Sequence, residues 1–440
     1  MRAAPLLLFV APFALSSCVL REDAAQDLVS SPCPDVLWQE ALAAALPPTT
    51  ASDPPLTFLN VGANKGYNIA NFLSLWHSSR GVSNRAWHAA ILRFARAVGS
   101  KSLQHVPHVS CGVCMVCKKP SPTARPKSAP RVAIHALELL PHNAQLLESV
   151  INRTGVRDLV NVHAVAASNA SGTLKFVRSK MANYGREQTM LCAGHAHAAL
   201  ASSARSSGGG GGVAASATTP GRDATGDDAG VGALPCTYRG KTVVKPEALA
   251  EVKVTTVDAF LSSQPGLLEQ PTFLVSVDTE GYDALVIEGM RTSLRQKRVR
   301  LLEFEYGAKG FWAPATPPPA AGKRTLQRLL SEILIPSGYV CYWQTKRHLV
   351  RVDEPCWAGA LTGSHASHSN VLCAHEPAVL AILDTLRPQS ARTLVDGLCG
   401  AYGRQRANEV WKGTNRTIGD ICESHYGGAA SACACQKAAP

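Results

Sequence analysis

Short apolar runs alternate with segments of helical periodicity along much of the chain, and this alternation limits the fold more than any other feature. The runs at 56–61, 132–137, 273–277 and 300–304 are apolar on both faces of a strand, and a segment of helical spacing follows each of them. Strands of this kind, alternating with helices, form parallel sheets that are covered on both sides. We therefore predict an α/β fold with a mostly parallel sheet, helices on both faces and a C-terminal β-hairpin.

Two stretches of the chain have compositions that do not suit a packed core. One combines three cysteines with four prolines, and the other contains five consecutive glycines. We predict one domain over 50–355 with insertions at about 77–130 and 192–245, the second including a disordered glycine-rich stretch at 198–234. A cysteine-rich C-terminal extension is expected at 356–440.

The amino terminus has the pattern of a secretory signal peptide. One arginine precedes an apolar stretch at 6–15, and small residues follow before the charge returns. We predict a signal peptide at 1–17, with a buried N-terminal helix as the alternative. The stretch is shorter than the roughly 20 residues that cross a bilayer, and we expect no stable membrane span.

The cysteine content also indicates the secretory pathway. The chain has fourteen cysteines, and it has glycosylation acceptors at Asn152, Asn169 and Asn415. Disulfides persist in oxidising compartments, so we predict a disulfide-bonded glycoprotein in the lumen of the secretory pathway or outside the cell. The residues before Cys18 also fit a bacterial lipoprotein cleavage site, which remains an alternative.

A cluster of three cysteines lies inside the first predicted insertion. Cys111, Cys114 and Cys117 follow His105 and His108, which is a spacing that zinc sites use. In an oxidising lumen the same cysteines form disulfides, and we predict no metal.

The net charge of +12 is carried by a chain in which charged residues make up only 17%. A nucleic-acid-binding arm concentrates lysine and arginine, whereas the densest groups here, at 291–300 and 323–328, are short and mixed with apolar residues. We therefore expect no nucleic-acid partner. The positive excess is predicted on the surface, around these two groups and in the insertions.

Chemistry-bearing residues follow the predicted strands. Gly62 and Gly66 come directly after the first strand, where glycine lets the backbone approach a ligand, although such a turn also simply connects a strand to a helix. Glu138 ends the second strand and can accept hydrogen bonds from a ribose, or can act as an acid at a helix N-terminus. Asp278 and Glu280 end a later strand, where two neighbouring carboxylates indicate a binding role.

Five segments in a fixed order carry a resemblance to a known family. They are Asn-Val-Gly-Ala-Asn-Lys-Gly at 60–66, Ala-Leu-Glu at 136–138, Asn-Val-His-Ala-Val-Ala-Ala at 161–167, Thr-Thr-Val-Asp-Ala-Phe-Leu at 255–261 and Val-Asp-Thr-Glu-Gly-Tyr-Asp at 277–283. Together they resemble the successive motifs of the FkbM-type methyltransferases over roughly residues 56–306, apart from the two insertions.

The resemblance implies a Rossmann-like methyltransferase fold with a seven-stranded sheet, and S-adenosyl-L-methionine as the cofactor. Glu138 is implied to hold the ribose, and Asp278 and Glu280 to face the reaction. Many relatives have an acid where this chain has Asn60, so the cofactor amine lacks a charged partner there. The implied cofactor-binding residues are Asn60, Gly62, Ala63, Asn64, Gly66, Glu138 and Ala166.

We expect an S-adenosylmethionine-dependent O-methyltransferase that acts on a hydroxyl of a glycan or of a small metabolite. Methyl transfer to a hydroxyl needs alignment and removal of a proton. Asp278 is the first candidate for the proton acceptor and Glu280 the second, with His163 and His195 as further candidates. The segment 183–185 either closes over the substrate or forms a simple turn.

Two other functions are compatible with the same sequence. A non-catalytic secreted binding protein on a Rossmann-like scaffold is the alternative, and Asn60 in place of an acid favours it. A nicotinamide oxidoreductase is the third, but the chain lacks the Gly-x-Gly-x-x-Gly fingerprint of such enzymes.

Overall fold

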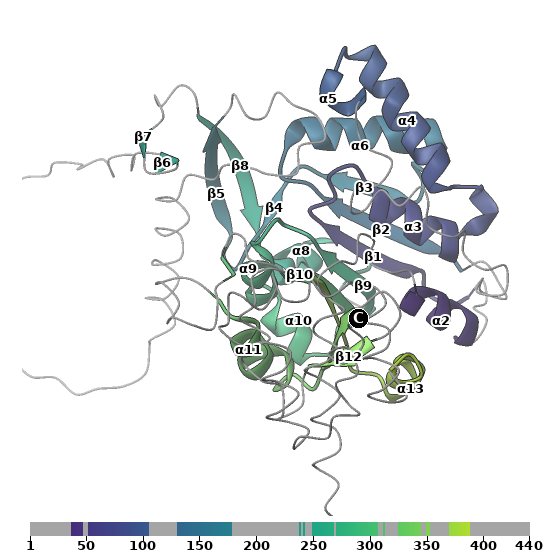
Figure 1. Cartoon of the computed structure of the whole chain (residues 1–440), viewed down its shortest axis with the longest axis vertical. Coiled ribbons are helices and arrows are strands. Elements are labelled where there is room, and N and C mark those ends of the chain that lie inside the picture. The colour runs from purple at the N-terminus through teal and green to yellow at the C-terminus, as the bar shows by residue number, and fades with distance from the viewer. Residues whose placement is uncertain are drawn as a thin grey trace, which may run out of the picture.

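The fold is built around an eight-stranded sheet with helices against both faces (Figure 1). The computed structural model describes residues 37–46, 52–104, 130–177, 237–238, 241–242, 249–267, 270–306, 311–312, 324–344, 349–352 and 369–387.

The strands form one large sheet and two small ones. The large sheet runs, in spatial order, β12 (Leu349–Arg351), β11 (Val340–Gln344), β13 (Ser369–Ala374), β10 (Val299–Tyr306), β9 (Thr272–Val277), β1 (Leu56–Val61), β2 (Val132–Leu137) and β3 (Val160–His163). A three-stranded sheet runs β4 (Ala166–Ala167), β8 (Leu249–Thr255) and β5 (Gly172–Val177), and β6 (Thr237–Tyr238) pairs with β7 (Lys241–Thr242).

The helices alternate with the strands of the large sheet. They are α2 (Leu37–Ala45), α3 (Tyr67–Trp76), α4 (Asn84–Ala97), α5 (Lys101–Gln104), α6 (Pro141–Thr154), α8 (Val257–Ser263), α9 (Asp283–Glu288), α10 (Arg291–Arg295), α11 (Leu326–Leu329) and α13 (Pro377–Asp384). Two single turns, η2 (Ser78–Arg80) and η6 (Leu330–Leu334), are a 3₁₀ turn and a π turn.

Strand β1 lies at the centre of the parallel part of the sheet. It pairs in parallel with β2 on one side and with β9 on the other, and β3 and β10 continue outward. Numbered by their order in the chain, these five strands run 3-2-1-4-5, which is the order of Rossmann folds. The order reverses between β1 and β9, and ligands of open α/β sheets bind at the carboxyl ends of the strands at such a point.

Neighbouring residues of one strand pack into different layers. Phe58 and Leu301 contribute to a hydrophobic cluster with α2, α3, α4, α6 and α13, while Leu59 and Leu302 contribute to a second cluster with α8, α9, α10 and α11. Because successive side chains of a strand point to opposite faces, the sheet is covered on both sides. The prediction of a mostly parallel sheet between two helical layers is confirmed.

The antiparallel strand β13 lies between β10 and β11 and pairs with both. Its residues Val371 and Leu372 are fully buried. The predicted domain boundary at 355 was therefore placed too early, because this strand and α13 belong to the core. Strands β11 and β12 pair antiparallel at the edge of the sheet. Counted from β3 to β11 the sheet has seven strands, and β12 adds the eighth.

Strands β5 and β8 lie outside the large sheet. β5 and β8 pair antiparallel with each other, and β4 adds a short parallel pair to β8. These strands are seen at the upper left of the main body, between the sheet and β6 (Figure 1). An antiparallel sheet can have one apolar face and one exposed face, whereas the strands of a parallel sheet are buried on both faces. β5 and β8 therefore do not belong to the predicted parallel sheet.

The predicted first insertion at 77–130 contains part of the domain core. Helix α4 packs on α3 and on α6, and its residues Trp87, Ile91 and Ala95 are fully buried. Helix α2, which precedes the predicted domain start at 50, packs against α13 and buries Trp38. Both helices have apolar positions at helical spacing, and burial of those positions ties them to the sheet.

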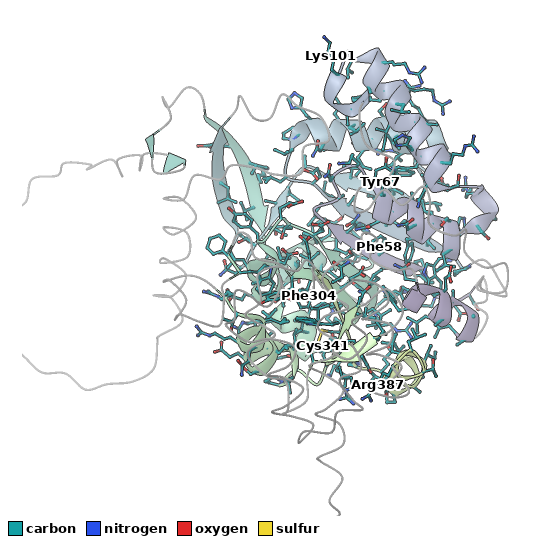
Figure 2. All side chains as sticks on the ribbon, in the orientation of Figure 1. Phe58, Tyr67, Lys101, Phe304, Cys341 and Arg387 are labelled. Carbon is teal, nitrogen blue, oxygen red and sulfur yellow. A yellow bond between two sulfur atoms is a disulfide. The ribbon has the colours of Figure 1, made fainter. Side chains whose placement is uncertain are left out.

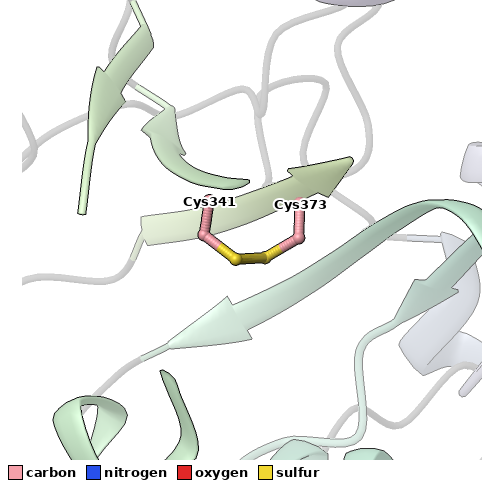
Figure 3. Close-up of a disulfide and its surroundings, with 2 residues drawn as sticks. All are labelled: Cys341 and Cys373. Carbon is pink, nitrogen blue, oxygen red and sulfur yellow. A yellow bond between two sulfur atoms is a disulfide. The ribbon is translucent and has the colours of Figure 1, made fainter. Parts of the chain in front are cut away.

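A disulfide joins Cys341 of β11 to Cys373 of β13 (Figure 3). The two residues face each other in register, with Cα atoms 4.1 Å apart and both side chains fully buried. The bond therefore crosses between β11 and the strand that connects it to the parallel core.

Several predictions concern residues outside the described part of the chain. These are the signal peptide at 1–17, the cysteine cluster at 111–117 with its upstream histidines, the glycine-rich stretch at 198–234, segment 183–185, His195 and Asn415. Within the described ranges, every helix is too short or too polar to cross a bilayer.

We predict that a chain ending at residue 355 does not fold cooperatively, whereas a chain ending at residue 387 does. The shorter chain loses β13 and α13 and exposes the apolar surfaces that they cover. Burial of each large apolar side chain is worth about 1.5–3 kcal/mol, and a whole domain is stable by about 5–15 kcal/mol. Circular dichroism during heating measures the difference. Equal melting temperatures for the two chains would show that β13 is not part of the cooperative unit.

Candidate functional site

The carboxyl ends of β1, β2 and β9 are tied together by backbone hydrogen bonds. The N–H groups of Gly62 and Ala63 donate to the carbonyl of Leu137 at 2.9 and 3.1 Å, and the N–H of Asp278 donates to the carbonyl of Val61 at 2.9 Å. The glycine turn, the end of β2 and the end of β9 thus meet at the switch point of the sheet, which is where the sequence predicted the site.

Gly62 lies directly after β1 and packs closely against the backbone that follows β9. Its φ is +81°, and a Cβ atom built on it would lie 1.9 Å from the carbonyl oxygen of Asp278. Any larger residue would push the two strands apart. The predicted need for glycine is therefore explained by strand packing, and it does not depend on a ligand.

Asn60 presents an unusual polar side chain just before this turn. It is fully buried, and neither its amide oxygen nor its amide nitrogen has a hydrogen-bond partner among the described residues. An unpartnered buried polar group costs about 1–3 kcal/mol of stability. Such a cost is expected where a ligand provides the missing hydrogen-bond partner.

Glu138 holds the loop that follows β1. Its Oε2 accepts the N–H of Asn64 at 2.7 Å and its Oε1 accepts the N–H of Leu140 at 2.8 Å. The carboxyl group is buried, and burial raises its pKa, while these bonds, the Asn143 side chain and the charge of Lys65 oppose the rise. The structure thus brings Glu138 and Asn64 together, and Glu138 holds the glycine turn in place; their predicted contact with a cofactor stays a prediction.

Helix α4 also supports the loop that follows β1, through contacts with Lys65 and Tyr67. The indole Nε1 of Trp87 donates to the carbonyl of Lys65 at 2.8 Å, and the Tyr67 hydroxyl is hydrogen-bonded to Nδ1 of His88 at 2.7 Å. Gly66 has φ +75°, and a Cβ atom there would lie 2.8 Å from the Trp87 ring. The sequence placed Trp87 and His88 in an insertion, so their role was missed. The sequence signal for this helix was the serine cap Ser83 followed by the aromatic Trp87 at a helical position.

The turn after β9 is held by a residue that the sequence did not single out. Asp283 is fully buried, and its carboxylate accepts the N–H groups of Thr279 at 3.3 Å and Gly281 at 3.1 Å. Burial, followed by the nearby Glu305, raises the pKa of Asp283 to about 7, against the effect of these bonds. Glu280 lies in this turn with a left-handed φ of +56°. In the sequence, the signal for this turn is a glycine soon after the strand, Gly281, followed two residues later by the acid Asp283.

Asp278 and Glu280 differ in exposure. Asp278 is exposed at the end of β9, and Glu280 is partly buried in the turn. Asp278 is thus open to a molecule that approaches this edge of the sheet.

Ala166 lies in the three-stranded sheet, on β4. Its side chain is buried with Leu140, Val252 and Val254 in a separate hydrophobic cluster. The structure gives it a packing role, and its predicted contact with a cofactor stays a prediction. Glu303 of β10 is also buried in the core, where it accepts a hydrogen bond from Gln344 at 2.6 Å.

His163, a candidate base, is paired with His135 of β2. Its Nε2 lies 3.2 Å from Nδ1 of His135, the rings are nearly parallel, and Phe260 meets both edge-on. Burial, and then the neighbouring His163, lowers the pKa of His135 to about 4; burial also lowers that of His163. One neutral ring has to donate to the other, so the pair is a packed structural contact.

The described residues contain no group of three or more His, Cys, Asp or Glu side chains placed to hold a metal ion. The polar side chains at the candidate site are the amide of Asn60 and the carboxylates of Glu138, Asp278 and Glu280.

Comparison with known proteins adds one weak similarity. No family model matches the chain, and no curated protein matches it. Among solved structures, the crystal structure of methyltransferase FkbM from Methylobacillus flagellatus matches with a TM-score of 0.30 and 9% sequence identity. The alignment covers 72% of this chain and 43% of that one, so the chain spans less than half of its length. These values are too low to assign the fold or to transfer residues.

We predict that Gly62→Ala destabilises the protein by about 3 kcal/mol or more, and Gly266→Ala by only about 1 kcal/mol. Both glycines have φ +81°, so each alanine is strained in the same way. Only at Gly62 does the added Cβ meet a backbone atom, while at Gly266 nothing lies within 4 Å. Denaturant unfolding measures both free energies. Equal losses would show that β1 and β9 are not packed this closely.

A second prediction concerns acid. Because the pKa of His135 is lowered to about 4, the unfolded chain binds a proton below about pH 6.5 that the folded chain does not. Stability is therefore lost as the pH falls from about 6.5 to about 4. His135→Asn keeps a polar group near the Nδ1 position without titrating. Between about pH 6.5 and about pH 4 we expect this variant to lose about 1–3 kcal/mol less unfolding free energy than the wild type loses. Parallel stability curves for the two proteins would contradict the pairing.

Proposed function

We propose that the protein is an S-adenosylmethionine-dependent methyltransferase. The observation that carries the proposal is the unpartnered amide of Asn60, fully buried at the end of the central strand and at the switch point of the sheet. A side chain kept there at a cost in stability is best explained by a ligand that satisfies it.

The residues at the switch point fit such a cofactor. An amide offers both an acceptor and donors, so Asn60 suits the amino acid end of S-adenosylmethionine, which carries an ammonium and a carboxylate. A carboxylate has about four acceptor positions, and Glu138 uses two for the backbone of the loop. The remaining capacity suits ribose hydroxyls. An edge that bears Asp278 and Glu280 also suits a cofactor with a positively charged sulfonium.

The antiparallel strand β13 favours this function over a nicotinamide oxidoreductase. Dinucleotide-binding Rossmann sheets continue the order 3-2-1-4-5 with a sixth parallel strand. Here β13 occupies that position and runs antiparallel to β10. Together with the missing glycine fingerprint, this strand removes the support for the oxidoreductase.

When bound, S-adenosylmethionine supplies an electrophilic methyl group. Asp278, exposed at the end of β9, is the residue of this chain best placed to accept the proton of an acceptor hydroxyl. Asp283 positions it indirectly, since it fixes the turn that carries Glu280. We propose a hydroxyl of a glycan or a small metabolite as the acceptor.

The disulfide between Cys341 and Cys373 supports a luminal or extracellular location. Buried structural disulfides are typical of proteins that fold in oxidising compartments. A glycan acceptor agrees with that location.

A non-catalytic binding protein is the second candidate. It is favoured by the engagement of Glu138 with Asn64 and Leu140, because this carboxylate would hold the loop equally well without a cofactor. Binding without turnover in a screen of labelled acceptors would select this function.

The test is a variant that should gain stability while it loses binding. Asn60→Leu has the same branched shape and removes the unpartnered polar atoms. We therefore expect its free energy of unfolding to be about 1–3 kcal/mol higher than that of the wild type. Binding of S-adenosylmethionine, measured by calorimetry, and methyl transfer should both be lost. Asn143→Leu is the matched control, because this buried amide is bonded to Asn64 and its removal should lower stability.

Two results would contradict the proposal. Wild-type protein that does not bind S-adenosylmethionine would remove the cofactor. An Asn60→Leu protein that is destabilised and binds the cofactor normally would show that the amide serves the fold.

A further inference from the structure

One long segment of the chain is rich in positive charge and contains no acid. Between Pro54 and Leu137 there are eleven lysines and arginines and no aspartate or glutamate, against a net charge of +12 for the whole protein. Nine of these eleven residues lie in the predicted insertion at 77–130, where part of the excess was expected, and the groups at 291–300 and 323–328 add eight more. With so many basic residues in one segment, some of their side chains are expected to lie close together on the surface.

Helix α4 and the start of α5 display part of this charge along one line. Arg85, Arg93, Arg96 and Lys101 are all exposed, and we call them the basic stripe. At 100° and 1.5 Å per residue, the three arginines fall within an arc of about 80° and span about 16 Å. Figure 2 shows Lys101 at the outer tip of this region, with nitrogen-bearing side chains projecting from α4 away from the body.

Within the described residues, the stripe has no acid in its own helices and no ion-pair partner. By contrast, three arginines of the other groups are paired within the fold: Arg300 with Glu376, Arg324 with Glu288 and Arg328 with Glu332. Their charges are neutralised locally, and those of the stripe are not.

We propose that the basic stripe binds an anionic polysaccharide. A line of fixed positive charges one side chain wide fits a linear chain that carries sulfate or carboxylate groups at intervals. Three of the four residues are arginines, whose guanidinium groups bind such anions through two parallel hydrogen bonds. The site stands apart from the candidate cofactor site and does not depend on methyl transfer.

The inner face of α4 argues against a membrane as the partner. A helix that lies on a membrane inserts an apolar face, but Trp87, Ile91 and Phe94 of α4 are buried against the domain. Of the large apolar side chains on α4 and at its described ends, Val98 alone is exposed. A partner that is recognised by charge, without insertion, fits this face.

Nucleic acid fits less well for two reasons. Single-stranded binding sites stack bases on exposed aromatic rings, and the aromatic residues of α3 and α4, Tyr67, Phe72, Trp76, Trp87 and Phe94, are all buried. The disulfide between Cys341 and Cys373 also indicates an oxidising compartment, where anionic polysaccharides are the abundant linear polyanions.

The experiment compares two triple variants of the full-length protein. The stripe variant is Arg85→Gln/Arg93→Gln/Arg96→Gln, and the control is Arg295→Gln/Arg328→Gln/Arg387→Gln, which removes the same charge from three scattered surface positions. The probe is size-defined heparin, measured by titration at several salt concentrations. We expect the stripe variant to bind about tenfold more weakly or worse and with a shallower salt dependence, and the control to stay near the wild type.

Matched polymers separate the possible partners. Neutral dextran should not bind, and duplex DNA and anionic lipid vesicles should bind more weakly than heparin at equal salt. Absence of heparin binding by the wild type, equal weakening in both triple variants, or tighter binding to DNA or to vesicles would each overturn the proposal. Unchanged melting temperatures of the variants show that any loss belongs to the surface. Because all these readouts are independent of S-adenosylmethionine, failure here leaves the proposed methyl transfer untouched.

Discussion

The close approach of β1 and β9 at Gly62 is the constraint on which the rest of the site depends. A carbonyl of β9 occupies the space where any side chain of residue 62 would lie. With the two strands this close, their ends and the end of β2 share hydrogen bonds, and the loop after β1 is forced across the edge of the sheet. The loop then needs support from both sides, which Glu138 gives from β2 and α4 gives from the outer layer. The position of Asn60 beneath this loop follows from the same geometry.

Helix α4 connects three properties that would otherwise look unrelated. Its inner face fills the core with Trp87 and Ile91, its Trp87 and His88 hold the loop through Lys65 and Tyr67, and its outer face carries the basic stripe. A helix packed this firmly on one side keeps its charges in fixed positions on the other. Arginines that are held in place lose less freedom when they bind an anion than arginines of a flexible arm.

The sequence predicted the parts of the fold that depend on local periodicity, and it missed those that depend on pairing between distant segments. β1, β2, β9 and β10 are mostly apolar runs followed by helices, so their type and order could be inferred. β13 is a short run beyond a long unassigned stretch, and nothing local indicates that it enters the sheet between β10 and β11. In the candidate site, Asn60, Gly62 and Glu138 follow strands and were identified. Asp283 lies in the motif at 277–283 but was not identified as a residue of the site, because its role depends on burial and on two backbone N–H groups.

Asn60 and Glu138 therefore report on the site in different ways. Glu138 bonds the backbone on both sides of the site, so its removal loosens the loop and would weaken a ligand whether or not the carboxylate touches it. Asn60 bonds no described residue, so its replacement by an apolar side chain of the same shape leaves the loop, the hydrogen bonds of Glu138 and the packing of Gly62 in place. A loss of binding accompanied by a gain in stability cannot arise from a damaged fold. The direction of these two changes at Asn60 thus separates recognition of a ligand from support of the loop, which no change at Glu138 can do.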